Sequence, residues 1–97
     1  SKGSMLNMYT ILNATLFEIE QLDIELTTKK KTGYGHIAGR PVPFPGIAQE
    51  EARLRQRIEK FEKQRDFLQR SIGEAELRLE LRAVEIEKAI SEPATQK

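Results

Sequence analysis

The chain has 97 residues, of which 32% are charged and 6% are aromatic, and it contains no tryptophan and no cysteine. A chain of this length forms one domain at most, and the lack of cysteine excludes disulfide bonds and thiolate metal sites. Sixteen basic and fifteen acidic residues give a net charge of +1, which argues against a protein that coats nucleic acid without specificity. No apolar run approaches the length that crosses a bilayer, so we expect no membrane partner and an intracellular, cytoplasmic location.

The first helix is predicted over residues 5–28. Residues 1–4 precede Met5, and we interpret them as an expression-tag remnant. Apolar residues then recur at steps of three or four, which places them on one face of a helix. This face consists of Met5, Met8, Leu12, Leu16, Ile19, Leu22 and Leu26. We expect Gly33 to supply a left-handed cap after the helix end, and lysines 29–31 to be favoured by the negative end of the helix dipole.

Residues 29–46, with the sequence KKKTGYGHIAGRPVPFPG, differ in composition from the rest of the chain. They contain four of the six glycines, three of the four prolines and the single histidine, and they lack acidic residues. A connection between two helices of a simple bundle needs only ~2–8 residues, so we expect an exposed, functional loop here. Its glycines favour a tight turn, and its alternating prolines favour an extended, polyproline-like arm.

This loop carries a surplus of four positive charges and supports three hypotheses. In the first, its cations bind a phosphate while a tyrosine or histidine ring stacks on a base. In the second, the charges are merely solvated and the apolar residues of the loop pack on the helices. In the third, the VPFP segment docks in a groove of a partner. The candidate residues for binding a ligand or partner are Lys29, Lys30, Lys31, Tyr34, His36, Arg40 and Phe44.

A second helix is predicted from Ile47 to Glu92, with Gly46 as its N-cap. Its apolar stripe alternates steps of four and three, which is a heptad pattern typical of helices that pack along one seam. The stripe consists of Leu54, Ile58, Phe61, Arg65, Leu68, Ile72, Ala75, Leu79, Arg82, Ile86 and Ala89. Pro93 ends the pattern, and we expect residues 93–97 to form a flexible C-terminal tail.

The two predicted helices differ in length, at ~36 Å and ~69 Å for ~1.5 Å per residue. In an antiparallel hairpin, Met5 lies opposite a residue near Ser71, and the chain from Ile72 onward has no partner of its own. This overhang is apolar on two sides, so we expect it to bind another copy of the chain. The expected oligomer interface consists of Ile72, Leu77, Leu79, Leu81, Val84, Ile86 and Ile90.

One alternative keeps the same residues inside a monomer. Gly73 breaks the second helix in this alternative, and residues 74–92 fold back as a third helix. A glycine costs only about 1 kcal/mol inside a helix, and no proline or polar turn cluster accompanies this one, so we favour the continuous helix.

These features predict an all-α fold class: an antiparallel helical hairpin, residues 5–92, that assembles as a coiled coil or four-helix-type oligomer. A single histidine without cysteine argues against a zinc site, and the serines lie too far along the helices to pair with His36. We therefore expect no enzyme activity, no metal and no cofactor. The function we predict is that of a non-enzymatic, homo-oligomeric interaction or scaffolding protein. Its expected partners are further copies of itself and another protein. Two alternatives remain: an oligomeric binder of nucleotide or nucleic-acid phosphate that uses the basic loop, and a regulator that blocks another protein's site with that loop.

Overall fold

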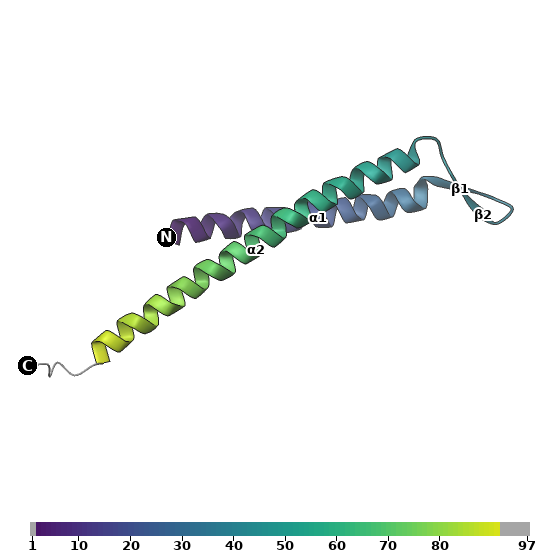
Figure 1. Cartoon of the computed structure of the whole chain (residues 1–97). Coiled ribbons are helices and arrows are strands. Elements are labelled where there is room, and N and C mark those ends of the chain that lie inside the picture. The colour runs from purple at the N-terminus through teal and green to yellow at the C-terminus, as the bar shows by residue number, and fades with distance from the viewer. Residues whose placement is uncertain (1, 92–97) are drawn as a thin grey trace, which may run out of the picture.

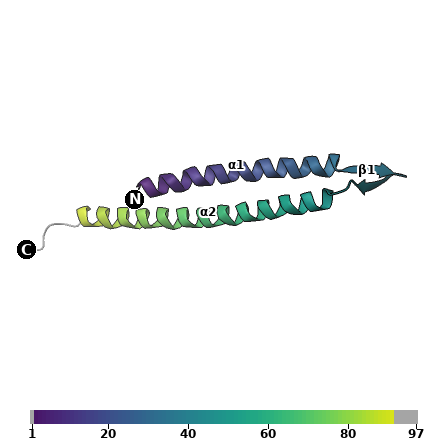
Figure 2. The same ribbon diagram turned by 90° about the horizontal axis from the view of Figure 1, so that it is seen from above.

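A computed structural model describes residues 2–91. The helix α1 spans Lys2–Thr32, the strands β1 and β2 span Tyr34–Ile37 and Arg40–Pro43, and the helix α2 spans Ile47–Ser91. The helices lie side by side and antiparallel, with the two strands projecting beyond one end and α2 extending past the start of α1 at the other (Figure 1, Figure 2). The two predicted helices are therefore confirmed. Glu92 and the tail predicted at 93–97 lie outside the described residues.

Helix α1 is longer than predicted at both ends. It begins at Lys2, and at its other end the three lysines belong to its last turn, where the negative end of the helix dipole favours cations. The predicted left-handed cap at Gly33 is wrong, because positive φ angles occur instead at Ala38, Gly39 and Gly46. Gly33 is needed for a different reason. A Cβ there would overlap the side chain of Ile47 and lie 2.6 Å from the carbonyl oxygen of Lys29.

The segment predicted as a loop contains a β-hairpin. Ala38 and Gly39 both have positive φ, at 52° and 78°, which is the geometry of a two-residue type I′ turn. The strands pair antiparallel, with Ile37 opposite Arg40 and His36 opposite Pro41. The predicted polyproline-like arm is thus extended but paired, which corrects the expectation of an unpaired segment.

Alternating prolines are compatible with this pairing because of the geometry of the ladder. The N–H of Phe44 donates to the carbonyl oxygen of Gly33 at 2.8 Å. Since bonded and non-bonded positions alternate in an antiparallel pair, the nitrogen atoms of Pro41 and Pro43 face away from β1. Proline at these positions removes no bond of the hairpin and leaves the outer edge of β2 without donors for a further strand.

The helices pack along one apolar seam. Its centre is a cluster of Leu22, Leu26, Leu54 and Ile58, with Phe61 packed against it. The prediction of Leu16 as a seam residue is wrong: Thr15 is 2% exposed, whereas Leu16 is 41% exposed. The amide of Gln64 donates to Thr15 Oγ1 at 2.6 Å, and this hydroxyl donates to the carbonyl oxygen of Ile11 at 2.7 Å. Because both groups are hydrogen-bonded, a polar pair is tolerated between the helices.

Helix α1 covers the seam of α2 as far as Ile72, slightly further toward the C-terminus than predicted. Ile72 is only 5% exposed, so it is a residue of the intrachain seam, which corrects its assignment to the overhang. The reason is that α1 starts at Lys2, which adds nearly one turn of cover. Helix α2 continues through Gly73 without a break, so the predicted continuous helix is confirmed over the fold-back alternative. The radius of gyration of 24.0 Å is about twice the ~13 Å of a compact domain of this length, as suits an elongated hairpin.

Candidate functional site

The junction between the helices and the β-hairpin is held by close backbone contacts. The N–H of Gly33 donates to the carbonyl oxygen of Lys29 at 2.7 Å, and the N–H of Ile47 donates to that of Phe44 at 3.2 Å. Glu50 N–H donates to the carbonyl oxygen of Gly46 at 3.1 Å, which is the first hydrogen bond of α2 and confirms Gly46 as its N-cap. The hairpin therefore has a defined position on the helices.

A groove of about 550 Å³ lies where this hairpin meets both helices. Its walls come from the last turn of α1, from one face of β1, from β2 and from the first three turns of α2. We call it the basic groove, and its lining residues are Lys30, Lys31, Tyr34, His36, Pro41, Glu51 and Arg55. Tyr34 and His36 share a face because side chains two residues apart in a strand point the same way.

The basic groove holds three cations around one carboxylate. The side chain of Glu51 is only 12% exposed, and its Oε1 lies 3.9 Å from Nη2 of Arg55. Its Oε2 is buried and has no hydrogen-bond partner among the described residues. Hydrogen bonding to this carboxylate, together with desolvation, raises the pKa of Tyr34, so the phenol is a neutral hydroxyl at physiological pH. The groove thus combines cationic donors with one buried acceptor atom, Glu51 Oε2, that has no hydrogen-bond partner among the described residues.

The predicted binding residues divide into two groups. Lys30, Lys31, Tyr34 and His36 come together in the basic groove. Three others lie outside it. Lys29 pairs with Glu50 across the helices at 3.3 Å, Arg40 flanks the exposed turn, and Phe44 covers Gly35 on the opposite face of the hairpin.

Sequence reasoning missed the contribution of α2 to the groove. The i to i+4 spacing of Glu51 and Arg55 suits an ordinary ion pair on a helix surface, but in the structure both residues line the groove. A usable signal was the proline spacing: prolines at every second position suit a strand that pairs through the intervening N–H groups. Had a β-hairpin been predicted from this spacing, its position directly before α2 would have indicated that residues in the first turns of α2 lie next to it.

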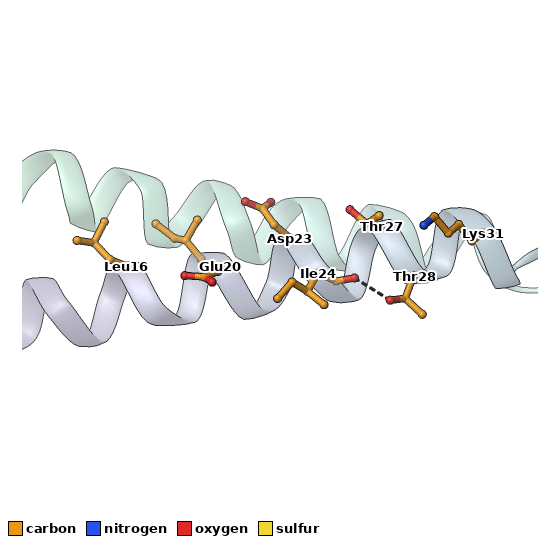
Figure 3. Close-up of a pocket in the computed structure, with 8 residues that line it drawn as sticks. Leu16, Glu20, Asp23, Ile24, Thr27, Thr28 and Lys31 are labelled. Atoms are coloured by element: carbon orange, nitrogen blue, oxygen red, sulfur yellow. Dashed lines mark hydrogen bonds between the residues drawn. The ribbon is translucent and has the colours of Figure 1, made fainter.

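A second hollow, of about 560 Å³, runs along one side of α1 (Figure 3). All of its lining residues belong to this one helix, and they are Leu16, Ile19, Glu20, Asp23, Ile24, Thr27, Thr28 and Lys31. Thr28 donates its hydroxyl to the carbonyl oxygen of Ile24 at 2.9 Å, so that group is satisfied within the helix. A single helix face without converging groups does not form a chemical site.

The distal segment of α2, residues 76–91, is exposed throughout. Its six large apolar side chains have exposed fractions between 49% and 78%; they are Leu77, Leu79, Leu81, Val84, Ile86 and Ile90. Tyr9, the eighth residue of α1, donates a hydrogen bond to Glu76 at the start of this segment. Despite this contact, the apolar side chains of the segment stay about half exposed or more within the described chain.

In comparisons with known proteins, no protein family, no curated protein and no solved structure matches the chain. Within residues 2–91, no helix combines the length and the apolar character that crossing a bilayer requires. The same residues contain no cluster of three or more His, Asp or Glu side chains placed to hold a metal ion.

Proposed function

We propose that this chain is a non-enzymatic interaction protein that self-associates through the distal segment of α2 and presents its β-hairpin end to a macromolecular partner. The observation that carries this proposal is the continuation of the seam. The heptad spacing that packs α2 on α1 runs on through the distal segment, where α1 no longer covers the apolar side chains. Apolar residues in seam register without a partner helix are typical of chains that pair with a further helix.

The distal segment has two apolar faces. Leu79, Ile86 and Ile90 continue the face that contacts α1 further along the helix, and we call this the seam face. Leu77, Leu81 and Val84 form an opposite face. Positions two apart in the sequence, such as Leu77 and Leu79 or Leu79 and Leu81, point about 160° apart around an α-helix. Both faces are about half exposed or more.

The occupant that fits the seam face best is the distal segment of a second copy. An antiparallel copy of α2 runs in the same direction as α1, so it takes the place beside α2 that α1 leaves empty. The same surface serves on both chains, and the arrangement closes as a twofold dimer. The β-hairpins then lie at opposite ends of the dimer, where Ile37 and Phe44 remain exposed for a partner.

The length of the overlap sets the strength of this association. A pairing over residues 76–91 is ~24 Å long and buries on the order of 1,000 Å² in total, which is at the lower limit for a specific interface. We therefore expect a dimer that dissociates on dilution. The opposite face supplies a further apolar surface through which two dimers can join.

The test is the solution mass of seam-face variants, measured by sedimentation equilibrium across protein concentrations. The double variant Leu79→Gln with Ile86→Gln keeps helix propensity and removes apolar surface from the seam face, so we expect monomers at concentrations where the original chain is dimeric. The matched control, Arg78→Gln with Glu85→Gln, alters the same helix without touching either apolar face, and we expect it to remain associated. A monomeric original chain at ~100 μM, or a seam-face variant with unchanged mass, refutes the proposal.

A further inference from the structure

The chemistry of the basic groove suggests a ligand, independently of self-association. The groove lies at the β-hairpin end of the molecule, whereas the distal segment lies at the other end of α2 (Figure 1). Variants in one region therefore leave the other intact, and the two proposals stand or fall separately.

The cations of the groove are available for an anion. Lys29 is engaged with Glu50, but Lys30 and Lys31 form no ion pair among residues 2–91. The guanidinium of Arg55 is more than half exposed and lies 3.9 Å from Glu51, too far for a strong hydrogen bond. Two ammonium groups and one guanidinium on adjoining walls match the several oxygens of a phosphate group.

The remaining lining residues are suited to the organic part of such a ligand. Tyr34 and His36 present rings from the same face of β1, and Pro41, directly opposite His36 in the ladder, adds a rigid apolar surface. Flat rings of this kind stack on bases irrespective of sequence. The buried Oε2 of Glu51 lacks a donor, and a ribose hydroxyl or an exocyclic amine supplies one.

The size of the groove agrees with a small molecule. Its volume of about 550 Å³ falls within the ~300–1,000 Å³ that small-molecule sites occupy. Orthophosphate alone would leave the rings and the carboxylate without contacts. We propose that the basic groove binds a nucleoside phosphate, with its phosphates on Lys30, Lys31 and Arg55, its base against Tyr34 and His36, and a donor group on Glu51.

The experiment is calorimetric titration of the full chain with ATP, with AMP, with inorganic phosphate and with a single-stranded oligothymidine. We expect ATP to bind more tightly than AMP, since it offers more oxygens to the same cations, and both to bind more tightly than inorganic phosphate. Added salt should weaken binding, because the contacts are between charges. Binding of ATP no tighter than that of inorganic phosphate overturns the proposal, and so does binding of the oligonucleotide without binding of ATP.

Charge-matched variants separate a site from general attraction. We expect Lys30→Ala and Arg55→Ala each to weaken ATP binding about tenfold or more, as charged hydrogen bonds usually do. Lys60→Ala and Arg57→Ala remove the same charges from exposed positions on α2 outside the groove, and we expect less than about twofold change. Equal weakening by groove and control variants refutes the site. Glu51→Gln removes the acceptor charge, and unchanged affinity in that variant refutes the role of Glu51.

Discussion

Replacing Leu54 by alanine tests whether the two helices are held by the seam. Leu54 has 0% exposure and lies in the cluster with Leu22, Leu26 and Ile58. Truncation of a buried leucine costs about 2–5 kcal/mol, made up of lost transfer free energy and the cavity that remains. Only two helices surround this site, so neighbouring side chains can close part of the gap. We therefore expect a loss of about 2–3 kcal/mol in the free energy of unfolding.

The assay is urea unfolding followed by helical circular dichroism at one protein concentration. For an m-value of about 1–1.5 kcal/mol/M, the expected loss lowers the midpoint by roughly 2 M. Leu54 is remote from the distal segment, so any contribution of self-association is the same in both chains and cancels in the difference.

Phe67→Ala is the matched control, because it truncates a large apolar residue on the same helix that is 62% exposed. We expect a change within about 0.5 kcal/mol. The reasoning is refuted if Leu54→Ala costs less than about 0.5 kcal/mol, or if the two variants cost the same.

Two further predictions concern the junction and the groove. Gly33→Ala should lower the thermal midpoint, because the added Cβ overlaps the side chain of Ile47. Gly73→Ala should raise it, because the added Cβ meets no atom within 4 Å and alanine favours a helix by up to ~1 kcal/mol. A higher midpoint for Gly33→Ala than for Gly73→Ala would contradict this account. Hydrogen bonding to Glu51 raises the pKa of Tyr34 above its ordinary value of 10.0, so this contact stabilises the folded chain below pH 10 and its contribution is lost as the pH rises through the raised pKa. In a phenolate absorbance titration, Glu51→Gln should return one tyrosine pKa toward 10.0 and leave that of Tyr9 raised; two unchanged transitions would show that the contact is absent in solution.

The sequence predicted only part of the basic groove. The concentration of lysines, tyrosine and histidine in one Gly/Pro-rich segment identified four of its lining residues. It also suggested Lys29, Arg40 and Phe44, which the fold directs elsewhere: to an ion pair with Glu50, to the turn and to the other face of the hairpin. A charge run indicates how much charge is near, but the direction of each side chain depends on the strand pairing.

Thr15 shows the same limit within a helix. The apolar pattern led to Leu16, although the steps through Leu12, Thr15 and Ile19 fit the seam equally well. The buried position of the hydroxyl depends on Gln64, which reaches it from the other helix. A hydrogen bond between residues so far apart in the chain leaves no trace in the spacing of apolar residues.

The sequence by itself determined the two helices, the seam along α2 and the excess length of α2 over α1. Each follows from the fixed rise and turn of an α-helix, so it can be counted along the chain without knowledge of the fold. Only the tertiary structure decided that residues 34–43 form a β-hairpin, and that this hairpin turns Tyr34 toward Glu51 and Arg55. That arrangement depends on the left-handed turn at Ala38 and Gly39 and on the close contact of Gly33 with Ile47, which are set by pairing and packing between separate parts of the chain.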